Sequence, residues 1–196
     1  MIPRQIFSAY DQRLADTPRE YRFCPLCGAP LSRDAHDPAA RMWCGNCGWV
    51  HYRNPPPGVV ILITEEDRVL IGRRAGSSFA PNLWCLPGGF VEFHEDFLTA
   101  AIRETREETG LDVEISSIIS VVSNFLAPDL HTLVVVLAAR VIGGTPFPGD
   151  DLAELRWTPL AGPFPDMAFE ADRHIIERYR LTILEGAPVD PDYTRP

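Results

Sequence analysis

GFVEFHEDFLTAAIRETREETGL, the stretch from Gly89 to Leu111, is the most informative part of this chain. Glu104, Glu107 and Glu108 are spaced i, i+3 and i+4, so a helix here places all three carboxylates on one face. Like charges at these spacings destabilise a helix by a few tenths of a kcal/mol per pair. A bound divalent cation makes the same arrangement favourable, because it attracts all three carboxylates, so the spacing predicts a metal site.

The same stretch contains signals that begin and end a helix. Asp96 suits the positive end of the helix dipole, and Gly110 follows the last helical position. Upstream, the sequence Leu-Pro-Gly-Gly, which ends at Gly89, predicts a turn that brings bare backbone close to the glutamates. A main-chain carbonyl there is a candidate ligand, and an oxygen-only ligand set suits Mg²⁺ or Mn²⁺.

The segment resembles the Nudix box, and the matching positions are Gly89, Glu95, Arg103, Glu104, Glu107, Glu108, Gly110 and Leu111. Thr105 departs from the box, which has a bulky aliphatic residue there, although its methyl group can still pack. The alternative interpretation is a charged, solvated helix face. The resemblance implies an α/β fold, a Nudix-type α/β/α sandwich with a mixed sheet.

The resemblance also implies a hydrolase that cuts the diphosphate bond of a nucleoside diphosphate linked to another moiety. Glu104, Glu107 and Glu108, helped by the Gly88 carbonyl, would bind Mg²⁺ or Mn²⁺ as the catalytic cofactor. Arg103 and Glu95 would hold loop and helix together as an ion pair. Bound metal would neutralise the diphosphate and lower the pKa of a water.

A further carboxylate is needed as general base or to hold the attacking water. Asp150, Asp151 and Glu154 are the candidates downstream of the box. Glu154 is favoured because it opens an expected strand and lies where Nudix proteins often place a later metal-binding glutamate. The alternative is an ordinary solvated loop carboxylate.

Two Cys-x2-Cys pairs form a second constellation, Cys24 with Cys27 and Cys44 with Cys47. Each pair is followed by glycine, which allows a tight turn, and the spacing predicts a zinc ribbon with four thiolate ligands and structural Zn²⁺. Disulfides are the alternative. The polar first residues contain no signal peptide, so a cytoplasmic location is expected. The fifth cysteine, Cys85, is expected to pack in a strand.

The expected organisation is an N-terminal arm at 1–22, the zinc ribbon at 23–53, a Nudix hydrolase domain at 58–180 and a flexible tail at 186–196. In the arm, the spacing of Phe7, Tyr10 and Leu14 suggests a short helix, and a proline-rich linker at 54–58 follows the ribbon. Apolar runs predict the strands, and the spacing of Ile175, Ile176 and Tyr179 predicts a closing helix. The strands are expected at 59–63, 69–73, 113–124, 133–141 and 154–158, and the helix at 168–179.

Composition limits the partners. The net charge of −9 makes a nucleic-acid-binding surface over the whole protein unlikely, although four arginines leave a local contact on the ribbon open. No apolar run approaches the ~20 residues that span a membrane. The Nudix resemblance implies a nucleotide small-molecule substrate and a homodimer.

The expected substrate is an adenine dinucleotide or ADP-sugar, such as ADP-ribose or FAD, giving AMP. An NADH pyrophosphatase is the alternative among zinc-ribbon Nudix proteins, although the Ser-Gln-Pro-Trp-Pro-Phe-Pro-x-Ser signature of that group is replaced here by the sequence from Ser120 to Pro128. A non-hydrolytic ligand sensor, with the ribbon as an interaction module, is the alternative from a different class. Candidate substrate contacts are Arg73, Arg74, His131 and the aromatic residues Phe79, Trp84, Phe125, Phe147, Phe164 and Phe169.

Overall fold

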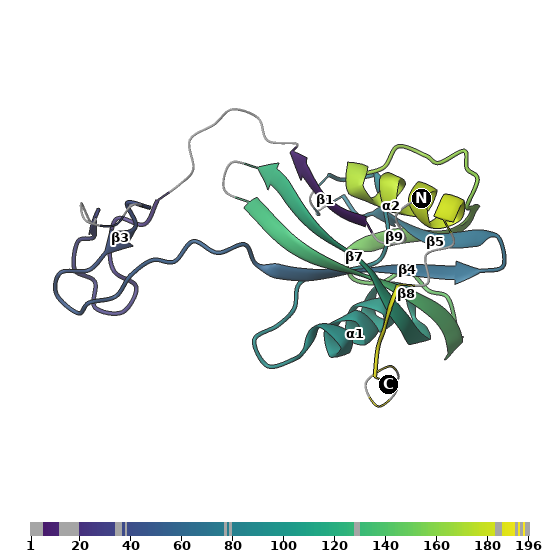
Figure 1. The fold of residues 1–196 in the computed structure, drawn as a ribbon, viewed down its shortest axis with the longest axis horizontal. Coiled ribbons are helices and arrows are strands. Elements are labelled where there is room, and N and C mark those ends of the chain that lie inside the picture. Colours follow the sequence, from purple (N-terminus) through teal and green to yellow (C-terminus); the bar gives the residue numbers. More distant parts are fainter. Residues whose placement is uncertain are drawn as a thin grey trace.

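A computed structural model gives the fold of the chain (Figure 1). It describes the backbone of residues 6–11 and the residues 20–33, 37, 39–76, 78, 80–127, 130–182, 186–190, 192 and 194. Leu14 and Phe79 lie outside the described residues.

Most of the chain forms one mixed sheet, with strand order β1-β7-β8-β4-β5-β6 and with β10 and β9 paired to β7 and β5. The central strands follow the long apolar runs, because such runs are buried when both sheet faces are covered. The strands are β1 (Ile6–Asp11), β4 (Pro57–Glu65), β5 (Arg68–Arg74), β6 (Trp84–Cys85), β7 (Leu111–Ala127), β8 (Leu130–Gly144), β9 (Leu152–Pro159) and β10 (Ala187–Pro188).

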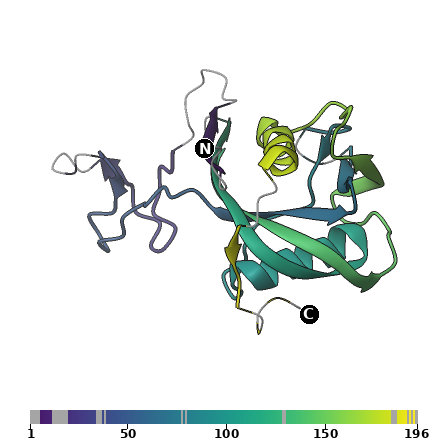
Figure 2. The same cartoon turned by 45° about the vertical axis from the view of Figure 1, so that its right-hand side comes forward.

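Helices α1 (Phe97–Thr109) and α2 (Glu170–Thr182) cover opposite faces of the sheet (Figures 1 and 2). Alternation along β4 sends Ile61 and Ile63 toward the apolar cluster of α1, and Leu62 toward that of α2. The predicted α/β/α sandwich is confirmed.

Helix α1 begins and ends at the predicted residues. The Asp96 side chain caps it by accepting hydrogen bonds from the backbone N–H groups of Leu98 and Thr99. Gly110 takes the left-handed conformation, φ 69°, and its N–H donates to the Arg106 carbonyl. Thr105 is fully buried and donates to the Ala101 carbonyl, so its hydroxyl is satisfied in the apolar stripe.

The cysteine-containing segment stands to one side of the sandwich in Figure 1, joined to β4 by an extended segment. It contains the short antiparallel strands β2 (Ser32–Arg33) and β3 (Met42–Trp43). Because β4 already begins at Pro57, the linker is shorter than predicted.

The two ends of the chain differ from expectation. Residues 6–11 form β1 rather than a helix, pairing in parallel with Ser120–Phe125 of β7. Near the C-terminus, β10 pairs with β7, and the Thr194 carbonyl accepts a hydrogen bond from Ile115 at 2.8 Å. Both segments satisfy backbone groups of β7, a long-range pairing that spacing along the chain does not reveal. No helix among the described residues is long and apolar enough to span a bilayer.

Candidate active site and metal centres

The three box glutamates of α1 differ in exposure. Glu104 and Glu108 are only 8% and 2% exposed, whereas Glu107 is open to solvent. The helix therefore holds two carboxylates at the edge of its buried stripe and leaves the third in water.

The glycine turn before α1 packs against β4 and the glutamates. Its carbonyls at Pro87 and Gly89 accept hydrogen bonds from Ile61 and Val59 of β4, both at 2.9 Å. The backbone N–H of Gly88 donates to Glu108 Oε2 at 2.9 Å. A Cβ at Gly89 would overlap the Glu104 carboxylate, so glycine is required for this approach. The Gly88 carbonyl accepts neither of these two hydrogen bonds from β4, so they leave it available as a metal ligand.

Arg103 links the turn, the helix start and the glutamates. Its Nε donates to Glu95 Oε2 at 3.0 Å, and Nη2 donates to the Phe90 carbonyl at 3.1 Å. Its Nη1 donates to Glu104 and Glu107, each at 2.9 Å. One guanidinium thus pairs with Glu95, as the resemblance implies, and also partly neutralises two of the box carboxylates.

Burial makes this acidic site favourable for a cation. Desolvation is the main cause that raises the pKa of Glu108 to about 8, partly offset by the Gly88 hydrogen bond. Desolvation also raises the pKa of Glu104, and Glu107 adds to it by charge repulsion. Hard carboxylate oxygens that cannot be fully solvated fit Mg²⁺ or Mn²⁺, which stabilise the ionised forms.

A cleft of about 320 Å³ opens beside these residues, a volume at the lower end for small-molecule sites. Its lining includes residues of the glycine turn and several acids, namely Gly88, Gly89, Glu104, Glu108, Asp150 and Asp151. Residues of β7 and β8 line it as well. Two of the three box glutamates thus line a cleft that can admit part of a nucleotide.

The structure does not bring Glu154 to the cleft. Its carboxylate accepts hydrogen bonds from Arg73 Nε at 2.9 Å and Arg156 Nη2 at 3.2 Å, and these arginines lower its pKa. The β5–β9 register places Glu154 opposite Arg73, on the strand rather than in the turn before it. Glu154 is therefore not among the residues that line the cleft, and its assignment stays a prediction.

The other two candidates, Asp150 and Asp151, do line the cleft. The turn that carries them is held against α1, because the N–H of Gly149 donates to the Glu108 carbonyl at 3.0 Å. Asp151 accepts a hydrogen bond from Arg74 at 3.2 Å, and Asp150 is exposed and lies close enough to Glu104 to raise its pKa.

Asp172 of α2 is a cleft residue that the sequence analysis missed. It is 3% exposed, it accepts a hydrogen bond from the N–H of Leu86, and burial raises its pKa to about 7. The available signal was its spacing, because Asp172 shares the inner helix face of Ile175, Ile176 and Tyr179. An acid in the first turn of a helix is more simply interpreted as a dipole partner.

The four ribbon cysteines bring their sulfur atoms within 4.8 Å of one another. Cys24 and Cys47 are 3.6 Å apart and Cys27 and Cys44 are 3.5 Å apart, so they are not disulfides. Tetrahedral Zn–S bonds of 2.3 Å require sulfur separations of about 3.8 Å, which these positions nearly match. In both pairs, a glycine N–H, at Gly28 and Gly48, donates to the first cysteine's carbonyl.

Comparison with known proteins agrees with this geometry. The NUDIX domain family matches residues 54–179, and the family described as Nudix N-terminal, a zinc ribbon, matches residues 22–53. The chain belongs to the Nudix family.

A solved NUDIX hydrolase from Nitrosomonas europaea is similar to this Nudix chain, with a TM-score of 0.73 and 30% identity over 86% of this chain and 96% of that one. The NAD-capped RNA hydrolase NudC of Stutzerimonas stutzeri is 30% identical over 82% of this chain and 56% of the relative. An ADP-ribose pyrophosphatase of Methanocaldococcus jannaschii is 34% identical over 65% of this chain and 75% of the relative. The Nudix chain thus spans little more than half the length of its NudC relative.

Most other candidate contacts lie outside the cleft of the Nudix domain. Among the aromatic candidates that the structure describes, Phe169 lines the cleft, as does Phe90, which was not predicted. Trp84 and Cys85 are buried, and Phe125 stacks on His131 with ring centroids 3.9 Å apart. Arg74 lines the cleft, whereas Arg73 pairs with Glu154. Of the remaining aromatic candidates, Phe147 is 70% exposed. Phe164 packs against the apolar cluster that includes α2.

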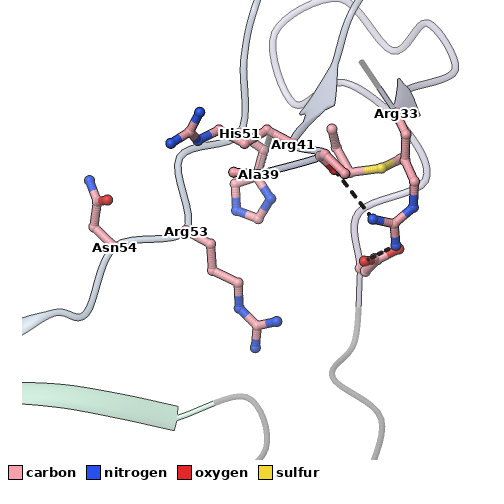
Figure 3. Close-up of a pocket in the computed structure, with 9 residues that line it drawn as sticks. Arg33, Ala39, Arg41, His51, Arg53 and Asn54 are labelled. Atoms are coloured by element: carbon pink, nitrogen blue, oxygen red, sulfur yellow. Dashed lines mark hydrogen bonds and ion pairs between the residues drawn. The ribbon is translucent and has the colours of Figure 1, made fainter. Parts of the chain in front are cut away.

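The Nudix ribbon has a second cavity, of about 380 Å³, which includes Arg33, Arg41, Arg53 and His51 in its lining (Figure 3). Two of the arginines pair with ribbon acids, Arg33 with Glu20 and Arg41 with Asp37. Such exposed pairs are weak, so an incoming anion can compete for the guanidinium groups.

Proposed function

We propose that this Nudix protein hydrolyses the diphosphate bond of an adenine dinucleotide or ADP-sugar, such as ADP-ribose or FAD, and releases AMP. The observation that carries the proposal is the convergence of Glu104, Glu108 and the Gly88–Gly89 turn on one cleft. Burying ionised carboxylates beside an open cleft costs folding free energy unless a cation neutralises them. Such groups are therefore typical of a functional site.

The residues of the site would have separate roles in metal binding and in positioning. Glu104, Glu107, Glu108 and the Gly88 carbonyl would hold Mg²⁺ or Mn²⁺, and the bound metal would neutralise the diphosphate and lower the pKa of a water. Arg103 keeps the turn and helix in register through Glu95 and the Phe90 carbonyl. Glu104 and Glu107, which now accept hydrogen bonds from Arg103, would be the carboxylates that hold the cation together with Glu108.

Asp150 is the residue that we assign to hold the attacking water or accept its proton. It lines the cleft beside Glu104 and no arginine pairs with it among the described residues, unlike Asp151, which pairs with Arg74. The four thiolates would hold a structural Zn²⁺, with no open position for chemistry.

The deciding experiment incubates the full chain with Mg²⁺ and a panel of ADP-ribose, FAD, NADH and ADP, and measures AMP by chromatography. Release of AMP from ADP-ribose or FAD, abolished by chelator, is the expected result. Tight binding of a dinucleotide without any product would contradict hydrolysis and favour the ligand sensor.

A second candidate substrate is a dinucleotide cap on RNA. The net charge made nucleic acid an unlikely partner, but the name of the NudC relatives and the arginine-lined ribbon cavity both favour it. Asn54 lines that cavity and Gly58 lines the cleft, and four residues of chain can span at most about 14 Å between these two residues.

Comparing free NAD with NAD-capped RNA tests this candidate. A kcat/KM at least about tenfold higher for capped RNA, which falls to the free-NAD value in Arg33→Ala, would support it. Equal values for both substrates would exclude a role for the ribbon cavity.

A further inference from the structure

The lining of the cleft also includes residues from β7 and β8. Leu126, Leu130 and Val134 are apolar, and the aromatic residue Phe169 lines the cleft as well. Two polar side chains interrupt this surface, Asn124 of β7 and Thr132 of β8. The antiparallel register places these two residues directly opposite each other.

Both polar side chains are nearly buried. Asn124 is 8% exposed and Thr132 is 4% exposed. Both residues line the cleft, and among the described residues neither the amide of Asn124 nor the hydroxyl of Thr132 bonds to another protein group. Neither is among the fully buried polar atoms without a partner, so both are available to a ligand in the cleft. Asparagine is also unfavourable inside a strand, so its presence here needs a reason other than folding.

The chemistry of the site identifies the ligand. A primary amide presents one acceptor and adjacent donors in a plane, which matches the N6 donor and N7 acceptor on one edge of adenine. Apolar and aromatic lining residues suit a flat ring. The acids and Arg74 line the same cleft, so a nucleotide can place its phosphates and metal beside them and its base against the apolar residues.

We propose that Asn124 recognises the adenine base of the substrate through its N6–N7 edge, with the Thr132 hydroxyl as an additional polar contact. This inference rests on the proposed function and adds to it the base that the site selects. Hypoxanthine replaces the N6 donor by an oxygen, which would face the Asn124 carbonyl. We therefore expect about 10- to 100-fold discrimination between the two bases.

The test measures binding of AMP and IMP to the full chain by calorimetry without divalent metal, so that it does not depend on hydrolysis. The wild-type protein is expected to bind AMP at least about tenfold more tightly than IMP. Asn124→Leu, similar in volume, is expected to bind both equally and to keep or raise the melting temperature, because it removes an unpaired amide. Thr132→Val is the matched control, with an AMP affinity reduced less than about fivefold.

Equal AMP and IMP affinities in the wild type, or a preference that survives Asn124→Leu, would overturn the inference. A lower melting temperature in Asn124→Leu with the AMP preference intact would make Asn124 structural. Nicotinamide mononucleotide binding more tightly than AMP, and only when Asn124 is present, would assign the amide to a carboxamide and also overturn it. An AMP preference that depends on Asn124, in a protein that releases no AMP from any substrate, would refute hydrolysis and leave this inference standing.

Discussion

The ribbon and the sandwich maintain their shapes by different means. In the sandwich, apolar residues from the strands and both helices fill clusters on each face of the sheet. Across the described residues 20–53, the buried side chains are Cys24 and Cys44, while rings such as those of Tyr21 and Tyr52 remain exposed. The ribbon has almost no hydrophobic core, so its fold depends on a metal.

The two metal centres use a related backbone device with different ligands. In each, a glycine turn places a backbone N–H close to the ligand set, at Gly28 and Gly48 in the ribbon and at Gly88 in the sandwich. Thiolates select zinc, and carboxylates select magnesium or manganese. The comparison teaches that one chain presents a soft thiolate cluster and a hard carboxylate cluster in separate parts of its fold.

The largest expected effect is loss of the ribbon metal. Cys24→Ser removes a buried ligand from a module without a core, and structural zinc in small domains contributes on the order of 10 kcal/mol. We expect zinc content to fall below one per chain and the ribbon to unfold while the sandwich keeps its melting transition. Elemental analysis and proteolysis check this, and an intact ribbon without zinc would contradict it.

The next largest expected effect is a loss of hydrolysis when a carboxylate of the sandwich is substituted. Glu107→Gln removes an exposed charge with little change in shape, so hydrolysis should fall on the order of 10³-fold, or about 4 kcal/mol of transition-state stabilisation. Circular dichroism and zinc content should match the wild type. A loss below tenfold would remove Glu107 from the metal site.

A pair of matched acid variants sharpens the assignment of the water-holding residue. Asp150→Asn is expected to lower kcat by about 10- to 100-fold, the usual size of a general-base effect. Glu154→Gln, a change of the same kind three positions beyond Asp151, should leave kcat within about twofold, because its carboxylate pairs with Arg73 and Arg156. The reverse ranking would restore the sequence-based choice.

Asp172→Asn tests the buried carboxyl under the cleft. Its pKa of about 7 in the folded protein, above the ordinary 3.8, means that the folded state retains a proton which the unfolded state loses as pH rises. Asp172 therefore opposes folding increasingly from about pH 4 to pH 7. The variant should match the wild type near pH 4 and be more stable by on the order of 4 kcal/mol above pH 7.

Urea unfolding of both proteins at several pH values measures the difference. A constant difference across this range would show that Asp172 does not keep its proton in the folded protein.

Local signals predicted most of the fold. The apolar runs gave β4, β5, β7, β8 and β9, and the residues Asp96 and Gly110 gave the limits of α1, because both depend on neighbours along the chain. Strands β1 and β10 depend on the edge of β7, which lies more than 60 residues away in sequence. Such pairing leaves little local pattern.

Residue spacing predicted which candidate site residues lie close together. The box glutamates and the two cysteine pairs each lie within a few residues of one another, so spacing alone brings them together. Glu154 does not lie with them, because the register of β9 against β5, rather than its position after the box, decides where its side chain lies. Asn124 and Asp172 were missed since their burial is a property of the assembled cleft.

Counting the two kinds of metal in matched variants tests the central claim most directly. Mn²⁺ binding, followed by electron paramagnetic resonance, and zinc content are measured together in the wild type, Glu107→Gln and Cys24→Ser. We predict that Glu107→Gln weakens Mn²⁺ binding at least about tenfold and keeps zinc, and that Cys24→Ser does the opposite. Unchanged Mn²⁺ affinity in Glu107→Gln would contradict a carboxylate metal site on α1.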